Sequence, residues 1–196
     1  MRIFIAALVL IFSFQLWTKA DDIGEFEIEG LSLGDSLLKF KKKSYIKETL
    51  SDSNSFFYKN KKFAVIGLSI NSDSYDAISA TIKPHDKKYI LYAIEGRIFY
   101  KNDMDNCIKK KSEILNDLQL IFKNKDFNNF ETKHTYDKTG KSLVYGNSLD
   151  LSGGSIDLFC IDWSKKLEKS KNFPDELKLM ISSSEFNNFI NNEAYD

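Results

Sequence analysis

The sequence has few of the residues from which functional sites are most readily recognised. Its 196 residues include two cysteines, two histidines and two prolines. The histidines, His85 and His134, have no second His or acid at metal-ligand spacing, so we interpret both as surface residues. The 28 basic and 28 acidic residues cancel, so net charge favours neither nucleic acid nor an acidic membrane surface as a partner. We expect no metal, no cofactor and no nucleic-acid partner. Acids are abundant, and a paired-carboxylate site stays open.

The chain also has no apolar run long enough for a comfortable membrane span, although it begins with a shorter one. Residues 3–17 are apolar, and the basic residue Arg2 precedes them. The next three residues, Thr18-Lys19-Ala20, resemble the small-residue motif that precedes signal-peptide cleavage. We predict a cleaved signal peptide over residues 1–20, with an uncleaved anchor as the alternative. The remaining chain is then periplasmic or secreted and is not an integral membrane protein.

Export changes how the two cysteines are interpreted, because exported proteins fold in an oxidising environment. Cys107 and Cys160 are 53 positions apart, which excludes C-x-x-C redox and zinc spacings. We predict a structural disulfide between them, with two buried free thiols as the alternative. Closing a loop of that length stabilises a fold by about 4 kcal/mol in the chain-entropy model.

The most regular pattern in the chain is an amphipathic helix over residues 103–122. Its apolar residues recur with the spacing of one helical face, and Asn102 or Asp103 is placed to cap its first turn. Cys107 lies in the first turn of the apolar stripe. Lys109 and Lys110 point away from the stripe and Lys111 borders it, so we interpret the three lysines as a solvated edge.

Strand patterns flank this helix on both sides. Residues 63–70 are continuously apolar, as in a strand covered on both faces, and residues 155–163 carry apolar side chains on both faces, with Cys160 on the face turned to the helix. We predict an α+β fold with a mainly antiparallel sheet and helices on one face. Residues 21–196 form one domain with two helix-then-three-strand units, 21–101 and 102–196. The other strands are expected at residues 25–29, 75–82, 89–100, 130–136, 142–150 and 176–182.

Shorter signals complete the predicted fold. Asp35 is the expected N-cap of a short helix over residues 36–40, and Gly96 suggests a bulge in its strand. Residues 164–172 are predicted to form a charged loop. Gly140 suggests a hairpin turn before residue 142, and Ser183 or Ser184 would cap a terminal helix that carries Phe186, Phe189 and Ile190.

One tetrapeptide, Gly34-Asp35-Ser36-Leu37, resembles the block that carries the nucleophilic serine of the GDSL (SGNH) esterases. The resemblance implies ester hydrolysis with Ser36 as nucleophile. The chain departs from the family because no histidine follows His134, and because the alternating β/α pattern of that fold is missing. A glycine turn with an aspartate N-cap explains the same residues.

A broader resemblance rests on residues 26–38, the lysine-rich helix after Cys107, residues 137–142 and 160–163, and the closing residues 184–195. With these features the chain resembles a group of short, uncharacterised secreted proteins of marine alphaproteobacteria. That resemblance implies architecture and export, and it implies no site. More loosely, the opening glycine-serine segment followed by helix and meander is similar to the SmpA/OmlA periplasmic domain, which helps outer-membrane proteins assemble. The chain has no lipid-anchor cysteine.

With no complete catalytic set, we expect a non-enzymatic periplasmic or secreted module that binds a protein or an envelope component. Two alternatives stay open. One is a small esterase that uses Ser36. The other is a carrier of a small apolar ligand, which the many aromatic residues would permit.

Overall fold

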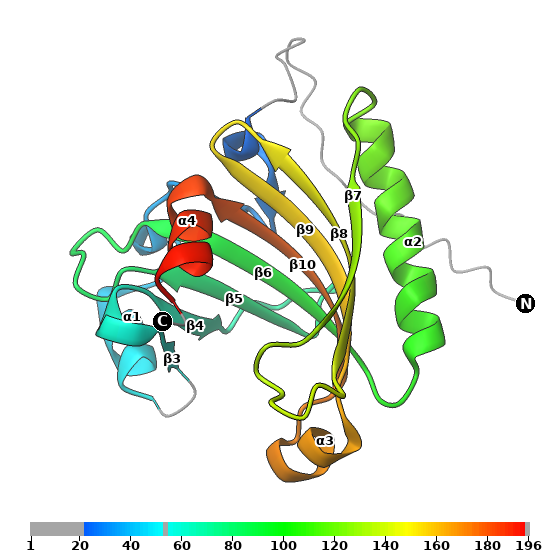
Figure 1. Ribbon diagram of the computed structural model, residues 1–196. Coiled ribbons are helices and arrows are strands. Elements are labelled where there is room, and N and C mark those ends of the chain that lie inside the picture. The colour runs from blue at the N-terminus through cyan, green and yellow to red at the C-terminus, as the bar shows by residue number, and fades with distance from the viewer. Residues whose placement is uncertain (1–21, 53–54, 195–196) are drawn as a thin grey trace, which may run out of the picture.

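Figure 1 shows one curved antiparallel sheet with helices on both of its faces. The computed structural model describes residues 22–52 and 55–194, so the predicted signal peptide, residues 1–20, lies outside the described residues. Within them the sheet has eight strands in the order β3-β4-β5-β6-β10-β9-β8-β7, which confirms the predicted α+β class. The strands are β3 (Phe56–Phe57), β4 (Ala64–Leu68), β5 (Ala77–Ile82), β6 (Leu91–Tyr100), β7 (Asn128–Lys133), β8 (Leu143–Leu151), β9 (Gly154–Asp162) and β10 (Asp175–Ser183).

The strand order divides the sheet into two meanders, each preceded by a helix. Helix α1 (Lys43–Ser51) precedes β3 to β6, and helix α2 (Met104–Ile121) precedes β7 to β10. The meanders meet where β6 pairs with β10. The sequence predicted this repeated layout with three strands in the first unit and three or four in the second. The structure has four in each, because the first unit also contains β3, a strand of only two residues.

The convex face of the sheet carries the main apolar core, which spans β4, β5, β6, β10 and β9 and includes Leu149 of β8. Successive strand residues point to opposite faces, so alternate residues of each strand enter one core. In β9 and β10 those residues are fully or almost fully buried, whereas their neighbours on the other face are mixed in character. The convex-side residues of these two strands are Ile156, Leu158, Cys160, Leu177, Leu179 and Ile181.

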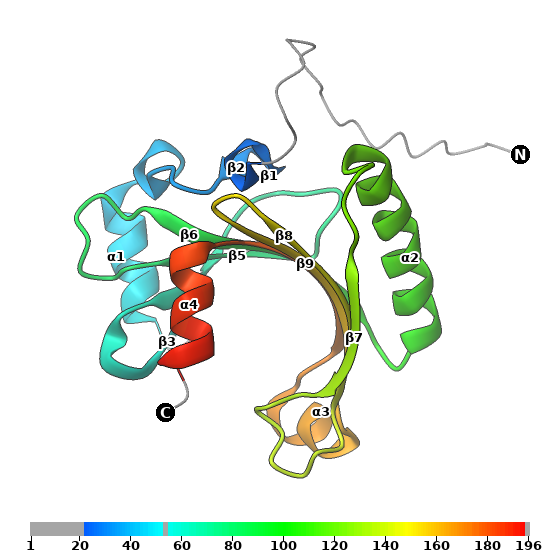
Figure 2. The ribbon, with the colours of Figure 1, turned by 45° about the horizontal axis from the view of Figure 1, so that its top comes forward.

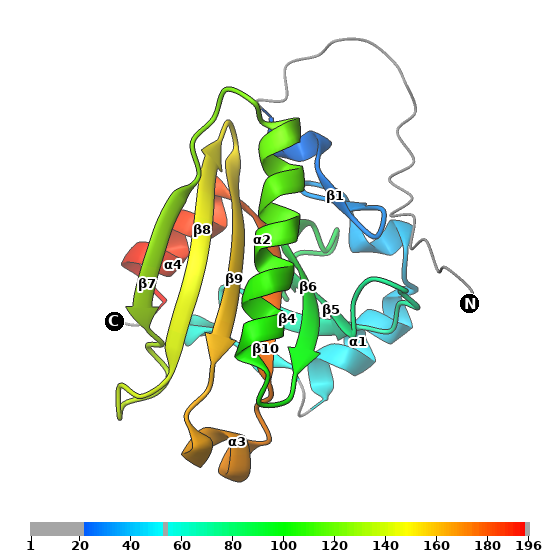
Figure 3. The same cartoon turned by 90° about the vertical axis from the view of Figure 1, so that its right-hand side faces the viewer.

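Helix α2 covers this face as its apolar stripe predicted. The carboxylate of Asp103 caps the helix by accepting from the amide of Asn106 at 3.3 Å, and the amide of Phe122 closes the other end on the carbonyl of Leu118 at 2.8 Å. Figure 3 shows α2 lying across β9, β10 and β6, and its residues contact all three strands. The predicted helix is confirmed to within one residue at each end.

The two cysteines join the helix to the sheet. The Sγ atoms of Cys107 and Cys160 are 2.00 Å apart and their Cα atoms 6.2 Å apart, so the predicted disulfide pair is confirmed. Both residues are completely buried. The bond lies between the first turns of α2 and the middle of the sheet.

The rest of the convex face is covered by the N-terminal segment. The predicted strand over residues 25–29 forms a separate two-stranded sheet, β1 (Glu27–Ile28) with β2 (Leu31–Ser32), between the 3-10 helices η1 (Ile23–Glu25) and η2 (Leu37–Lys39). Ile28, Leu31 and Leu37 enter the same core as α2, and so does Ile46 of α1.

The predicted cap of the helix after Gly34 is wrong by one residue. The hydroxyl of Ser36 accepts the amide proton of Leu38 at 3.2 Å, whereas the side chain of Asp35 pairs with Lys39. A serine hydroxyl is as good an N-cap acceptor as an aspartate carboxylate, so residue type alone could not separate the two positions.

Helix α4 (Ser184–Asn192) lies on the opposite, concave face, although the helices were expected on one face. Ser183 caps it by accepting from the amide of Phe186 at 3.3 Å. Phe186 and Phe189 pack with Phe63 and Ala93 in a second core of their own. Figure 2 shows α4 and α2 on opposite sides of the curved sheet.

Three further predictions need correction. Residues 164–172 were expected as a loop but contain the helix α3 (Lys165–Lys171). The bulge lies where Thr81 and Ile82 pair with β6, not at Gly96, where the ring of Tyr75 occupies the space that a Cβ would need. Strand β4 is covered on one face only, because Val65 is half-buried and Gly67 exposed on the concave side.

Candidate functional site

The concave face of the sheet forms an open groove of about 1550 Å³. We call it the concave groove. Figure 2 shows that the sheet curves around this space, with α4 on one side and α3 on the other. The groove has a polar floor on β6 and β10 and two walls that carry aromatic side chains. Its lining comes from both meanders, so neither half of the chain forms it alone.

Four charged residues make up the floor, which we call the charged floor. Glu95 and Arg97 come from β6, and Glu176 and Lys178 from β10, each pair at the two-residue spacing that places side chains on one face. The Nζ atom of Lys178 lies 3.1 Å from Oε2 of Glu95 and 3.9 Å from Oε1 of Glu176. The Nη1 atom of Arg97 lies 3.8 Å from Oε2 of Glu176.

The register explains why the acids are needed. Lys178 lies directly opposite Arg97 across the β6·β10 ladder, and two like charges in that position repel. Glu95 and Glu176 flank the two cations and compensate them. Burial by itself would lower the pKa of Lys178, but the charges of Glu95 and Glu176 raise it above its ordinary value. Lys178 is therefore held as a cation in the floor.

The guanidinium of Arg97 has one buried donor without a hydrogen-bond partner among the described residues. Its Nη2 atom donates to the hydroxyl of Ser79 at 3.3 Å, and its guanidinium carbon lies 5.8 Å from the ring centre of Phe99. Its Nε atom is buried and has no hydrogen-bond partner among the described residues. A buried donor without a partner is costly, and the Arg97 side chain as a whole is 31% exposed. A carbonyl or carboxylate brought into the groove would therefore be favoured beside this guanidinium.

The wall near α3 is a cluster of rings. His134, Trp163 and Phe173 pack one after another with tilted rings, with ring centres 4.3 Å apart for the first pair and 4.8 Å for the second. Tyr136 lies 5.7 Å from Phe173 and leaves half of its surface exposed, at 50%. Burial lowers the pKa of His134, and the nearby charge of Lys178 lowers it further, against an opposing effect of Asp137.

Asp137 fixes the turn that carries this wall. Its carboxylate accepts from the amide and hydroxyl of Thr139, at 2.9 and 2.7 Å, and from the amide and hydroxyl of Ser142, at 3.0 and 2.7 Å. These hydrogen bonds hold its pKa well below its usual value. Gly140 adopts the positive φ of +67° that the predicted hairpin turn required.

The opposite wall is formed by β3 and α1. Phe56 is 53% exposed, and its ring meets that of Tyr58 edge-on at 4.9 Å. Tyr58 packs in turn against Phe189 of α4 at 5.5 Å. Each wall therefore presents one largely exposed aromatic side chain, and each of these rests on further rings behind it.

The predicted site residues do not meet in this groove. The hydroxyl of Ser36, the candidate esterase nucleophile, donates to the carbonyl of Lys88 at 2.5 Å besides capping η2. Both partners are backbone groups, so the structure places Ser36 in a capping role. His85 is exposed. His134, expected at the surface, is half-buried in the groove wall, where its Nδ1 accepts the amide of Tyr136 at 3.2 Å.

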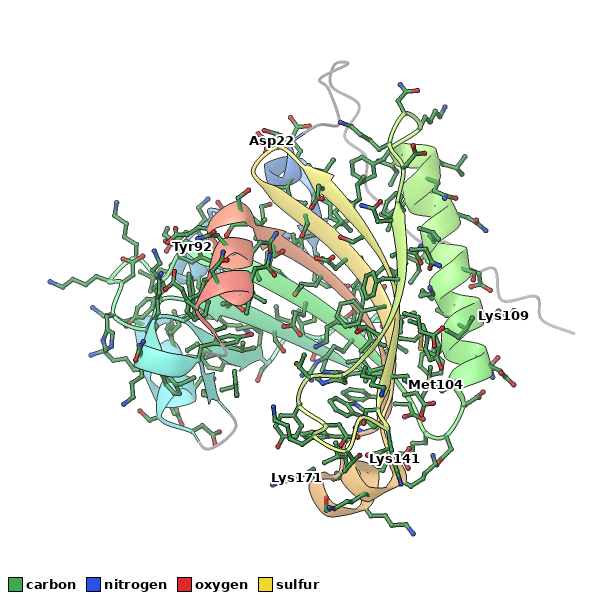
Figure 4. The ribbon with its side chains drawn as sticks, viewed as in Figure 1. Asp22, Tyr92, Met104, Lys109, Lys141 and Lys171 are labelled. Atoms are coloured by element: carbon green, nitrogen blue, oxygen red, sulfur yellow. A yellow bond between two sulfur atoms is a disulfide. The ribbon has the colours of Figure 1, made fainter. Side chains whose placement is uncertain are left out.

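Lys111 also differs from the prediction of a solvated edge. It is 8% exposed and its Nζ atom donates to the side-chain oxygen of Asn147 on β8 at 2.8 Å. Burial lowers its pKa. Lys109 and Lys110 lie on the outer side of α2, as expected (Figure 4 labels Lys109).

Other kinds of site find no support in the part of the chain that the structure describes. Across residues 22–52 and 55–194, no group of three or more His, Cys, Asp or Glu side chains could hold a metal ion. Over the same residues no helix is both long and apolar enough to cross a membrane. Comparisons of the chain with protein-family models, curated proteins and solved structures found no match.

Sequence reasoning missed the charged floor. Its signal was present, since Glu95-Gly-Arg97 and Glu176-Leu-Lys178 place charges at alternate positions inside two predicted strands. That alternation shows that one face of each strand is polar. It does not show that the two strands are neighbours, and the sequence separates them by the whole of α2 and three strands.

Proposed function

We propose that the protein is a non-enzymatic binding module that holds a protein partner in the concave groove. The observation that carries this is the combination, in one groove, of an exposed aromatic side chain on each wall and an unpaired Arg97 donor in the floor. Aromatic residues and arginine are the residue types most enriched in the energetically dominant centres of protein interfaces.

The rigidity of the groove supports the same proposal. Tyr136 and Phe56 are each backed by packed rings, and the floor belongs to the two central strands of the sheet. Few side chains would have to become ordered when a partner binds, which lowers the entropic cost of association.

The size and polarity of the groove favour a macromolecule over a small apolar ligand. Ligand pockets are usually closed cavities of about 300 to 1,000 Å³ with mostly apolar linings. This groove holds about 1550 Å³, and charged residues form its floor. A small apolar molecule there would cover the remaining exposed parts of Glu95 and Lys178, 13% and 18% of their side chains, without offering them a polar partner.

We also propose that the module works outside the inner membrane, in the periplasm or beyond it. The signal-like residues 1–20 and the Cys107–Cys160 bond both support export, because such bonds persist in oxidising compartments. The partner would then be an exported protein or a protein of the cell envelope.

Site-specific photo-crosslinking in the producing cell tests the groove. A photoreactive amino acid is placed at Tyr136, at Phe56 or at Leu120, which is 67% exposed on α2 and serves as the matched control. We expect the same protein to be crosslinked from both groove positions and not from Leu120. A crosslink that is equally strong from Leu120, or no common product from the two groove positions, would contradict the proposal.

Binding of the purified partner then measures the contribution of the groove. Truncating a central anchor of an interface costs about 2 kcal/mol or more, which is about a 30-fold rise in Kd. We expect a loss of that size for Tyr136→Ala in calorimetry and no measurable change for Leu120→Ala. Equal affinities for the two variants would remove Tyr136 from the interface.

A further inference from the structure

A second surface adjoins the groove wall near α3, where the β7–β8 turn meets this helix. We call it the basic tip and define it as residues 133–141 and 165–171. Trp163, Phe173 and Leu167 pack in one small core under these segments, which holds the turn and the helix together. The hydroxyl of Ser142 also accepts the amide of Ser164 at 2.9 Å and ties the two segments to each other. The tip is therefore one surface.

The basic tip contains seven lysines and no arginine, against two acids. Both acids have partners within the tip. Asp137 is buried and its carboxylate is occupied by Thr139 and Ser142, and Glu168 pairs with Lys165 at 2.9 Å with 17% of its side chain exposed. All seven lysines are exposed, so the outer surface of the tip is cationic. The lysines are Lys133, Lys138, Lys141, Lys165, Lys166, Lys169 and Lys171.

An acidic segment lies at the opposite end of the sheet. Residues 22–35 include five acids and no lysine or arginine. The amide of Ile23 donates to the carbonyl of Ser152 at 3.2 Å, which places this segment at the β8–β9 turn, whereas the basic tip adjoins the other end of β8. Figure 4 shows Asp22 at one end of the sheet and Lys141 and Lys171 at the other. The acidic segment and the basic tip are therefore separated by the length of the strands.

We propose that the basic tip docks the protein on an anionic lipid bilayer. Lysine is a strongly hydrated point charge on a flexible stem, suited to a diffuse layer of headgroups, whereas arginine is the residue that recognises individual carboxylates in a fixed geometry. Lysine is also depleted from protein–protein interfaces. A surface of seven exposed lysines on one compact support therefore suits a layer of anionic headgroups. The acidic segment over residues 22–35 would orient the molecule with its tip toward the membrane.

The basic tip adjoins the groove wall near α3, and Tyr136, Lys138 and Lys171 belong to both surfaces. The two proposals can still be tested separately, because the vesicle experiment requires no partner protein. Lys141, Lys166 and Lys169 do not line the groove, so the test variant leaves the groove intact. A failure of lipid binding would leave the groove proposal unaffected.

Cosedimentation of the purified, oxidised protein with lipid vesicles tests the proposal. The test variant is Lys141→Gln/Lys166→Gln/Lys169→Gln, at three exposed tip lysines that do not line the groove. The matched control, Lys42→Gln/Lys43→Gln/Lys47→Gln, removes the same charge from exposed lysines near α1. Each lysine near an anionic surface contributes about a fivefold gain in binding, so three together contribute on the order of a hundredfold.

We expect the protein to bind vesicles of phosphatidylcholine mixed with phosphatidylglycerol and to be released by salt. It should not bind phosphatidylcholine alone. The tip variant should bind about a hundredfold more weakly, and the control variant should stay within about threefold of the wild type. Since all six lysines are exposed, both variants should keep the urea midpoint of the wild type.

Three results would overturn the proposal. One is no binding to the anionic vesicles at low ionic strength. Another is an equal loss in the two variants, which would make the effect one of net charge alone. The third is retention on immobilised polyglutamate without any retention on vesicles, which would assign the tip to an acidic polypeptide instead.

Discussion

The two faces of the sheet are built from alternate residues of the same strands, yet they differ in almost every property. In β9, Leu158 is fully buried beneath α2, while the next residue, Phe159, is half-buried on the concave side below the Nζ atom of Lys178. The convex face has a continuous apolar core and the disulfide. The concave face has paired charges, an unpaired arginine donor and exposed rings.

This difference separates stability from function within one sheet. Burial of apolar side chains on the convex side stabilises the folded protein. The concave side can therefore carry charged and exposed aromatic side chains, which a core optimised for stability would exclude. Charges in the floor are tolerated because they are mutually paired, not because they stabilise the fold. The comparison predicts which substitutions should unfold the protein and which should change only its surface.

Removing the disulfide should have the largest effect on the convex side. Closing a loop of 53 residues stabilises by about 4 kcal/mol in the chain-entropy model. We expect Cys107→Ala/Cys160→Ala to lower the free energy of unfolding by about that amount in urea denaturation. Mass analysis under non-reducing conditions should find no free thiol in the wild type. Two free thiols there, or an unchanged urea midpoint in the variant, would contradict the structure.

A pair of neighbours in β9 sharpens the comparison. Leu158→Ala leaves a cavity in the convex core and should cost about 3 kcal/mol. Phe159→Ala removes a larger side chain but from a half-buried position, and should cost about 1 to 2 kcal/mol. Urea denaturation of both variants measures the difference. A greater loss for Phe159→Ala would mean that the concave face also carries the core.

The charged floor offers a smaller effect. Lys178→Met leaves Glu95 and Glu176 without their shared cation and should cost about 2 kcal/mol at neutral pH. Burial already raises the pKa of Glu176, against the lowering effects of Lys178 and Arg97. Because a raised pKa contributes stability that is lost as pH rises through it, the variant should regain stability on acidification.

The matched control for that variant also removes the charges of the two acids and keeps Arg97. Glu95→Gln/Glu176→Gln/Lys178→Met removes the acids together with the lysine, and we expect most of the lost stability to return. Urea midpoints at two pH values distinguish the variants. If the triple variant is less stable than Lys178→Met alone, the floor is a source of stability and the comparison of the two faces fails.

The last prediction concerns acidic pH, where Asp137 becomes protonated. Its pKa is lowered by hydrogen bonds, so its contribution is present above the ordinary pKa of 3.8 and is lost as pH falls toward the lowered value. The urea midpoint of the wild type should therefore fall between about pH 5 and about pH 2, and Asp137→Asn should show a weaker dependence. Parallel pH profiles for the two proteins would show that the turn does not depend on this carboxylate.

Most of the fold was accessible from the sequence because local signals agreed with the tertiary structure. The stripe over residues 103–122 predicted α2, and the Cys160 face of residues 155–163 predicted which side of the sheet it covers. The errors occurred where alternatives are physically close. Ser36 and Asp35 are equivalent caps, and the lysine-rich residues 164–172 form a helix whose stability comes from packing of Leu167.

The candidate site was not accessible in the same way. It depends on pairing between β6 and β10, which no local pattern encodes, and on the side of the sheet that α4 covers. The charge distribution was hidden for a related reason. Equal numbers of acidic and basic residues predicted no strong electrostatic field at the protein surface. The structure nevertheless separates the acidic residues 22–35 from the basic tip by the length of β8.

The pairing of β6 with β10 also sets an order of events when the chain is made. β6 is complete at Tyr100, but β10 begins only at Asp175, so the first meander leaves the ribosome with its inner edge unpaired. An exposed strand edge of ten residues invites pairing with other chains. The nascent first half therefore needs protection until the last strand arrives, and a chain truncated before β10 should aggregate instead of forming half a sheet.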